Sequence, residues 1–132
     1  MPHVIVEYSA NIEDRVDMPG FCDMLRRAAI ETGVLPLPGV RVRAFRADHV
    51  SIADGDPKHG FIDISVRLRG GRDLATRQRA TQHIFEAAHR FLAPVMARHP
   101  VALSFEMRDI DPELSHKTGT IRDHLKGTAD NE

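Results

Sequence analysis

Several residue types are scarce in this sequence, and each scarcity excludes a class of protein. The 132 residues contain no tryptophan, one tyrosine and six phenylalanines, so the core must be built mainly from aliphatic side chains. The single cysteine, Cys22, excludes an internal disulfide and a metal site built from several cysteines. No apolar run approaches the length of a membrane span, and the start of the chain lacks the positive region of an export signal. We therefore expect a cytoplasmic protein with no membrane partner.

Lysine is also scarce, whereas arginine is abundant. Of the 18 basic residues, 15 are arginine and three are lysine, and the formal net charge is −1. This balance gives no indication of a nucleic-acid partner. A planar guanidinium can grip a carboxylate with two parallel hydrogen bonds, so arginines in a site favour acidic ligands. Codon bias is the simpler explanation for most of the arginines. The position of each arginine in the sequence must show whether it belongs to a binding site.

The first 48 residues have the pattern of a strand, a helix and a second strand. Residues 2–8 are β-branched and apolar, which predicts a strand, and Pro2 suits its first position because it has no N–H group to offer. A helix is predicted over residues 17–32, with Asp17 as its N-cap. The second strand is predicted over residues 40–47.

The same order repeats after a turn-rich loop at residues 50–60. Residues 61–68 alternate strictly between apolar and polar side chains, which predicts a half-buried strand. A longer helix is predicted over residues 73–99 with Asp73 as its N-cap, and Pro94 predicts a kink or a break in it. The apolar positions of this helix are expected to face the core; they are Leu74, Ile84, Phe85, Ala88, Leu92, Val95 and Met96.

A fourth strand, predicted over residues 101–107, completes the second unit. The economical assembly is an α/β domain in which two tandem β-α-β units, at about 2–48 and 61–109, form one four-stranded sheet with two helices on one face. Residues 110–132 are a polar C-terminal extension of this single domain, with a short helix near residues 121–126. We expect the last six residues, GTADNE, to be frayed.

Strand alternation also predicts the composition of the sheet face that the helices leave open. If Val42 and Ala44 face the helices, Arg41 and Arg43 face the other way. A mixture of apolar, small and arginine side chains is unusual for a solvent face and suits a surface covered by other copies of the chain. An oligomer is therefore expected. The residues assigned to this face are Ile5, Arg41, Arg43, Phe45, Phe61, Ala102 and Ser104.

No spacing typical of a metal or nucleotide site occurs. The eight histidines form no HExxH pattern, and a solvated helix face explains the pair Glu86 and His89. Gly70 and Gly71 lack the spacing of a phosphate-binding loop, so a plain turn explains them. Arg72 follows, just before a predicted helix N-terminus whose free N–H groups would help it to hold a carboxylate. A solvated turn arginine is the alternative interpretation of Arg72.

The second residue offers a different chemistry. Removal of the initiator methionine before a proline would give Pro2 a free secondary amine at the end of a strand. The reference pKa of an α-amino group is about 8, and burial or nearby cations lower it by favouring the neutral form. Arg41, Arg43 or Arg72 could supply those cations. A neutral amine near physiological pH is a competent general base, and its protonated form can return the proton elsewhere.

Five stretches of the sequence together resemble one known family. In order and spacing they resemble the 5-carboxymethyl-2-hydroxymuconate isomerases, which belong to the tautomerase superfamily, over roughly residues 1–126. The five stretches are MPHVIVEYS, GVRVR, ADG, GGRDLATRQ and ALSFEM.

The resemblance implies a homotrimer with the tautomerase-like fold, no metal and no cofactor. It implies that Pro2 is the catalytic group and that Arg41 and Arg72 bind substrate; we add Arg43 because it shares a strand face with Arg41. The implied substrate is a small polycarboxylate enol, 5-carboxymethyl-2-hydroxymuconate. It would be converted to its conjugated 2-oxo isomer during the breakdown of homoprotocatechuate, which derives from 4-hydroxyphenylacetate.

Two alternatives to this function stay open at the level of sequence. One is a tautomerase that acts on another enol acid with the same proline and arginines. The other is a non-catalytic trimeric protein that binds acidic ligands. The first would differ in its preference among tri-, di- and monocarboxylate substrates, and the second would bind ligand without turnover and regardless of Pro2.

Overall fold

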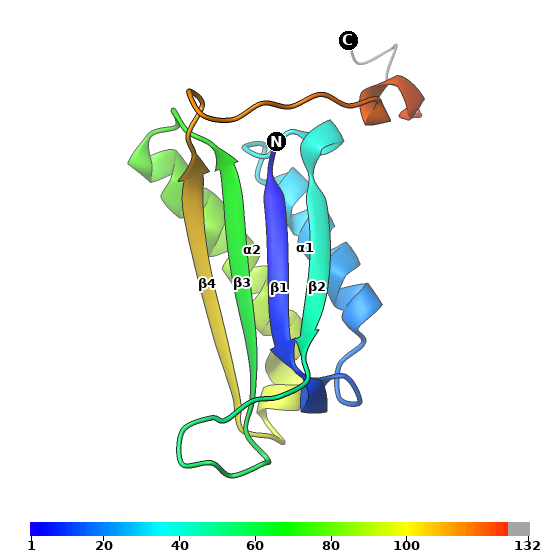
Figure 1. Cartoon of the computed structure of the whole chain (residues 1–132), viewed down its shortest axis with the longest axis vertical. Coiled ribbons are helices and arrows are strands. Elements are labelled where there is room, and N and C mark those ends of the chain that lie inside the picture. Colours follow the sequence, from blue (N-terminus) through cyan, green and yellow to red (C-terminus); the bar gives the residue numbers. More distant parts are fainter. Residues whose placement is uncertain (127–132) are drawn as a thin grey trace.

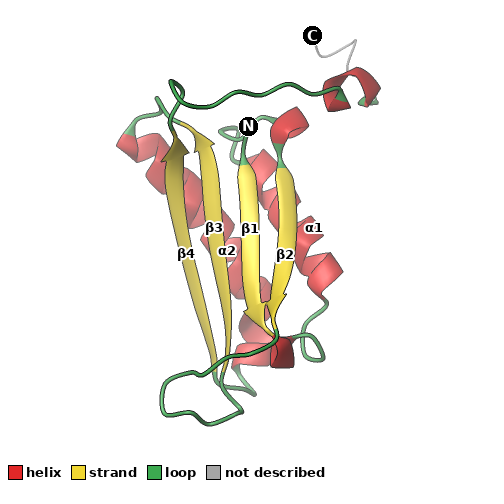
Figure 2. Ribbon diagram, viewed as in Figure 1, coloured by secondary structure: helices red, strands yellow, loops and turns green. Residues whose placement is uncertain are grey.

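The computed structural model describes residues 1–126; the expectation for the last six residues lies outside the described part of the chain. A mixed sheet of four strands carries two α-helices, α1 and α2, which both lie behind it (Figures 1 and 2). The elements are β1 (His3–Ser9), η1 (Ala10–Ile12), α1 (Met18–Glu31), η2 (Leu37–Gly39), β2 (Arg41–Ala47), β3 (Gly60–Arg69), α2 (Leu74–Met96), β4 (Val101–Ile110) and η3 (Ile121–His124).

The sheet has the order β2-β1-β3-β4. Strand β1 pairs in parallel with β2, and β3 pairs in parallel with β4, so each β-α-β unit forms one half of the sheet. The halves join through the antiparallel pair of β1 and β3, in which Val6 lies opposite Ile64. The predicted α/β class, with two β-α-β units and both helices on one face, is confirmed.

Period-two alternation places the core between the sheet and the helices. Val4, Val6, Ile62 and Ile64 are fully buried on the helix side. They meet helix residues spaced by three or four, the spacing that keeps side chains on one helix face. The buried helix residues are Met18, Phe21, Leu25, Ala28 and Ala29 of α1 and Ala80, Ile84, Ala88, Leu92 and Val95 of α2.

Both long helices begin at the aspartates that the sequence predicts. The side chain of Asp17 accepts a hydrogen bond from the Gly20 N–H group at 3.0 Å, and that of Asp73 accepts one from Thr76 N–H at 2.8 Å. Each bond satisfies a backbone donor that the first helical turn leaves without a partner. Gly33 follows α1 with a φ of +72°, a left-handed conformation that glycine adopts without strain and that stops the helix.

The structure differs from three expectations for α2. Pro94 does not break the helix into two pieces, because only two helical residues follow the proline and few helical bonds are affected. It ends at Met96 rather than near residue 99. Leu74 is 61% exposed, since it is the first residue of the helix and precedes the buried stripe that begins at Ala80.

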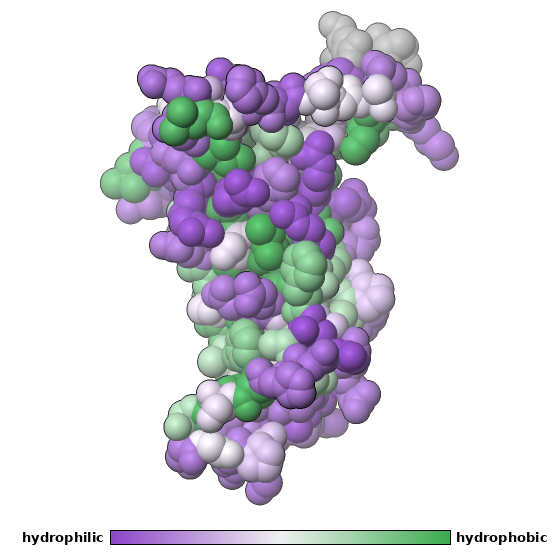
Figure 3. Space-filling view, viewed as in Figure 1, coloured by the Kyte–Doolittle hydropathy of each residue, from purple (hydrophilic) through white to green (hydrophobic). Residues whose placement is uncertain are grey.

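The other face of the sheet is not covered by the described part of the chain (Figure 1). The register aligns His3 with Arg41 on one side and with Arg67 on the other, so a basic row crosses one end of this face. Phe45 is 55% exposed farther along β2. Figure 3 shows hydrophobic and hydrophilic side chains mixed over this face, as the alternation predicts.

The described part of the C-terminal extension runs across one edge of the sheet. From the end of β4 it passes over the start of β1 to the entrance of β2, where η3 lies (Figure 1). The short helix expected near residues 121–126 is observed as the 3-10 turn η3, Ile121–His124. Within residues 1–126 no helix is both long and apolar enough to cross a membrane.

Candidate active site

The direction of the strands gathers the candidate residues at a single sheet edge. Because β1 and β2 are parallel, Pro2 and Arg41 lie side by side at their starts, and the Arg41 N–H group donates to the Pro2 carbonyl at 3.3 Å. Strands β3 and β4 run the opposite way and end at the same edge. Two residues 39 positions apart in the chain thus share one site.

A proline-rich turn seats Pro2. Pro36 precedes the 3-10 turn η2 and Pro38 lies within it; the Gly39 N–H group donates to the Pro36 carbonyl at 3.0 Å. A β-carbon at Gly39 would lie only 2.9 Å from Cδ of Pro2, so the proline ring rests directly against this backbone. The fixed φ of the two prolines makes the turn stiff, and we infer that it holds Pro2 in place.

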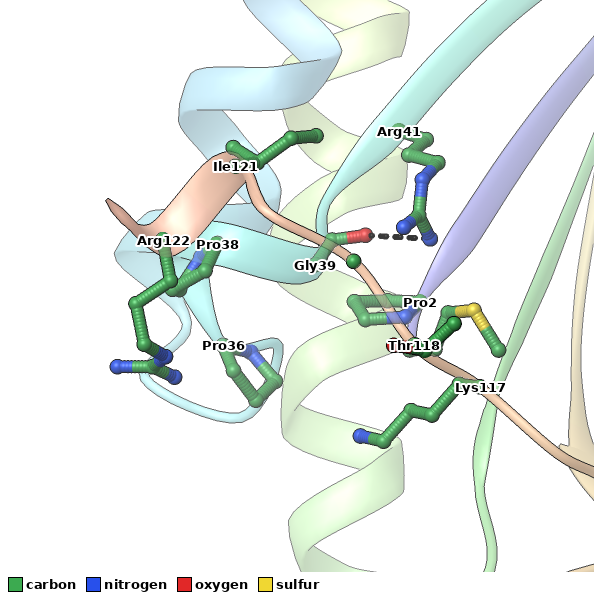
Figure 4. Close-up of a pocket in the computed structure, with 11 residues that line it drawn as sticks. Pro2, Pro36, Pro38, Gly39, Arg41, Lys117, Thr118, Ile121 and Arg122 are labelled. Carbon is green, nitrogen blue, oxygen red and sulfur yellow. Dashed lines mark hydrogen bonds between the residues drawn. The ribbon is translucent and has the colours of Figure 1, made fainter. Parts of the chain in front are cut away.

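A cavity of about 380 Å³ opens beside Pro2 (Figure 4). The proline-rich turn and Arg41 form one wall, and the C-terminal segment crosses the opening on the other side. Arg41 extends toward Pro2 and donates from Nη1 to the Gly39 carbonyl at 3.5 Å. The lining residues are Met1, Pro2, Pro36, Pro38, Gly39, Arg41, Lys117, Thr118, Gly119, Ile121 and Arg122.

The terminal amine at this cavity is held toward its neutral form. Its pKa lies below the ordinary 8.0, first because of partial burial, then because of the charge and hydrogen bond of Lys117, and then because of Arg41 and Arg72. Desolvation and nearby cations both disfavour an ammonium ion. In the full chain this amine belongs to Met1, the residue next to Pro2.

The other two predicted arginines lie outside the cavity wall. Arg72 precedes α2 and donates from Nη1 to the Arg69 carbonyl at 2.7 Å, yet it is near enough to lower the pKa of the terminal amine. Arg43 lies two residues after Arg41 in β2, on the open face of the sheet. Its Nη1 forms a hydrogen bond with His3 Nδ1 at 3.0 Å. Of the four predicted site residues, Pro2 and Arg41 line the cavity, and Arg72 and Arg43 do not.

His3 has a lowered pKa because of partial burial and, after that, the charges of Arg67, Arg43 and Arg41. A neutral imidazole can accept the Arg43 hydrogen bond at Nδ1, whereas a protonated one cannot. The pair therefore orients the Arg43 guanidinium next to the basic row of His3, Arg41 and Arg67.

The sequence reasoning missed the contribution of the C-terminal segment. Lys117, Ile121 and Arg122 line the cavity, although the extension was predicted only as a polar tail. One signal was available: Lys117 is one of three lysines in an arginine-rich chain. The place of Pro36 and Pro38 in the cavity wall depends on the tertiary fold.

Other reactive groups lie away from this edge. Cys22 is half-buried in α1, and burial raises the pKa of its thiol, which disfavours a reactive thiolate. No group of three or more histidine, cysteine or acidic residues within the described part of the chain could hold a metal ion. What the edge offers is an amine with a lowered pKa among several fixed cations, an arrangement suited to moving a proton on an anion.

Comparisons with known proteins agree with this arrangement. The family model for 5-carboxymethyl-2-hydroxymuconate isomerase matches residues 2–125. The 5-carboxymethyl-2-hydroxymuconate Delta-isomerase of Escherichia coli is 34% identical over 121 residues, which cover 92% of this chain and 96% of that protein. A crystal structure of a 5-carboxymethyl-2-hydroxymuconate delta-isomerase superposes with a TM-score of 0.88 at 30% identity, over 94% of this chain and 92% of the other.

A more distant likeness concerns the fold alone. The fused 4-OT, solved as a symmetric trimer, matches with a TM-score of 0.59 at 16% identity, over 88% of this chain and 93% of that chain. The resemblance inferred from the five sequence stretches is confirmed, and so is the expectation of an enzyme. The chain belongs to the 5-carboxymethyl-2-hydroxymuconate isomerase family, whose members share the tautomerase fold.

Proposed function

We propose that this protein converts 5-carboxymethyl-2-hydroxymuconate to its conjugated 2-oxo isomer, with Pro2 as the acid–base group. The observation that carries the proposal is the position of Pro2 in the wall of a cavity that it shares with Arg41 and Lys117. The E. coli relative is named for this reaction. Membership of its family supports the same reaction type here.

The proposal requires that Met1 be removed, because Pro2 is a base only when its nitrogen is free. Its amine then replaces that of Met1, one residue deeper beside Arg41. We expect burial and neighbouring cations to favour the neutral amine there, as they do for the amine of Met1. We expect the working enzyme to begin at Pro2.

The proposed reaction moves one proton and shifts the double bonds. The neutral Pro2 nitrogen accepts the proton of the enol hydroxyl at the second carbon, and the C–O bond becomes a carbonyl. The double bond between the second and third carbons moves to the third and fourth. The electrons of the bond between the fourth and fifth carbons then take the proton from the Pro2 ammonium ion at the fifth carbon.

Arginine side chains have two tasks in this scheme. They orient the three carboxylates of the substrate so that the reacting carbons lie near the amine. They also stabilise the negative charge that develops on the oxygen as the hydroxyl proton leaves. We propose that Arg41 contacts the substrate next to Pro2. Arg72 would reach the substrate from the turn before α2, and Arg43 would reach it from the open face of the sheet. Neither a metal nor a cofactor has a role in the scheme.

We further propose that the enzyme acts as a homotrimer in the cytoplasm, within homoprotocatechuate breakdown. The open sheet face, with Phe45 half-exposed and a basic row beside it, supports coverage by other copies of the chain. The fused 4-OT, which has this fold, is a symmetric trimer. Arg43 lies on that face, so assembly would enclose it near the site.

The test is an ultraviolet assay of 5-carboxymethyl-2-hydroxymuconate ketonisation by protein without a tag, beside the Pro2→Ala variant. Intact mass must first show that the protein begins at Pro2. We expect rapid turnover, and a loss in kcat/KM of about 10²-fold or more in the variant because proton transfer is impaired. No turnover by correctly processed protein would overturn the named substrate. Turnover of other enol acids, or ligand binding without turnover, would favour the two alternative functions.

A further inference from the structure

The C-terminal segment contributes a cation to two neighbouring cavities. Lys117 lines the 380 Å³ cavity beside Pro2, and it also lines a second cavity of about 160 Å³. The second cavity lies against the ends of β3 and β4, at Arg69 and Ile110. The only other residue shared by the two linings is Met1. Lys117 and Met1 thus stand at the boundary between the two spaces.

Removal of Met1 changes this boundary. The proposed function already requires that Met1 leave, and Met1 is part of both walls. Without Met1, we expect the two spaces to join into one elongated site beside Pro2. One end lies at Arg41 and the other at Arg69, with Lys117 between them. An elongated site with cations along its length matches a substrate that carries several carboxylates.

Four cations at this edge have no ion pair with an acidic side chain of residues 1–126. They are Lys117, Arg41, Arg69 and Arg72. By contrast, arginines elsewhere in the chain are paired: Arg26 with Asp23 at 2.8 Å, and Arg46 with Asp48 at 2.7 Å. Several positive charges gathered without acidic partners leave room for an anionic ligand.

The side chain of Lys117 lies in the wall of the cavity beside Pro2. Its positive charge is near enough to the terminal amine of Met1 to lower the pKa of that amine. In Figure 4 the side chain extends from the crossing segment into the space below Pro2 and Pro36. The hydrogen bonds that hold the start of the segment come instead from Leu114 and Ser115, which both donate to the Asp111 carbonyl. The Lys117 side chain is therefore free of that structural task.

We propose that Lys117 is a substrate-binding residue, which holds a carboxylate at the junction of the two cavities beside the Pro2 nitrogen. The inference rests on the proposed function, and it adds a fourth cation to the arginines that the sequence indicates. It also assigns a role to the C-terminal extension, which brings this cation across the sheet edge. Lys117 disfavours the ammonium form of the amine until the substrate's negative charge compensates for it.

Binding of a non-reacting tricarboxylate tests the inference without relying on turnover. Isothermal titration with propane-1,2,3-tricarboxylate would compare processed wild type, Lys117→Ala, Lys117→Arg and Lys58→Ala. Lys58 is an exposed lysine in the loop at the opposite end of the sheet, so its loss makes the same change in net charge away from the site. We expect Kd to rise about tenfold or more for Lys117→Ala, because a charge-assisted hydrogen bond is lost. Lys117→Arg should keep most of the affinity, and Lys58→Ala should match wild type.

Kinetics supply a readout that a purely structural role would not move. Lys117→Ala should raise KM. It should also shift the part of the pH profile where kcat/KM rises with pH to higher pH, because the amine loses a neighbouring positive charge and its pKa rises. Unchanged binding and an unchanged limb in Lys117→Ala would overturn the inference, as would no tricarboxylate binding by wild type. Wild type could bind the tricarboxylate more tightly than Lys117→Ala does and yet never isomerise the named substrate. In that case the proposed function fails and this inference stands.

Discussion

A β-carbon added at Gly39 would lie 2.9 Å from Cδ of Pro2, closer than two such carbons can approach. Gly39 belongs to the turn that leads into β2, and Pro2 leads into β1. The contact therefore sets the proline ring against the strand that carries Arg41. A substitution at Gly39 would change the position of the proposed base without changing any charged group.

We predict that Gly39→Ala lowers activity while the fold persists. The added methyl group must displace the Pro2 ring, and a shift of about 1 Å in a reacting group can cost on the order of 10²-fold in rate. Steady-state kinetics would measure the loss, and circular dichroism would verify the secondary structure. A well-folded variant with wild-type kcat/KM would show that the close contact does not position the base.

The pH dependence of kcat/KM should report the amine. Burial and the charges of Lys117, Arg41 and Arg72 lower the pKa of the Met1 amine. We expect the same causes to lower the pKa of the free Pro2 amine, whose neutral form is the proposed base. Activity should therefore rise with pH through this lowered pKa and then level off. Arg41→Ala should move the rising limb to higher pH, and by more than Arg72→Ala, because Arg41 has the larger influence on the amine. If neither Arg41→Ala nor Arg72→Ala shifts the rising part of the pH profile, this electrostatic account is contradicted.

The pair formed by His3 and Arg43 makes a prediction for NMR. Burial and the surrounding arginines lower the pKa of His3, so its ring should titrate below the ordinary 6.5. Removal of one charge in Arg67→Gln should raise that pKa, because Arg67 is the strongest of the charged influences. A proton NMR titration of the imidazole C–H signals would measure both values. A His3 pKa at or above 6.5 in the wild type would refute the prediction.

The N-cap of α2 should make a contribution to stability that depends on pH. Hydrogen bonds from the Thr76 hydroxyl and N–H groups lower the pKa of Asp73 below 3.8. A carboxyl whose pKa is lower in the folded state stabilises the fold above its unfolded pKa, and that stabilisation is lost as the pH falls through the folded pKa.

The matched variant is Asp73→Asn, which keeps a good N-cap without a titratable charge. At equal protein concentration, wild type should melt on the order of 1–3 °C higher than the variant near pH 6. This difference should shrink toward zero as the pH falls below the reference pKa of aspartate, about 3.9, and through the lower pKa of Asp73 in the folded state. A difference that stays constant over that range would show that the Asp73 charge does not contribute.

Local pattern was sufficient for most of the secondary structure. Alternation placed Ile62, Ile64 and Val66 on one face of β3, and the aspartates at residues 17 and 73 marked both helix starts. These features depend on neighbours within about four residues, which the sequence displays directly. The break that was one expectation at Pro94 is absent, because the effect of a proline depends on how many helical residues follow it. Periodicity marks helix ends poorly, so the end of α2 at Met96 was not predicted.

For the site, the sequence by itself predicted the type of chemistry, and the tertiary structure decided which groups meet. Met1-Pro2 at the start of a strand and the pattern of alternating arginines indicated an amine base among cations before any fold was known. The placement of Gly39 against Pro2, and of Lys117 across the sheet edge, follows from strand order and direction. Such contacts join residues that are distant along the chain, and only the packed sheet, with β1 beside both β2 and β3, brings them together.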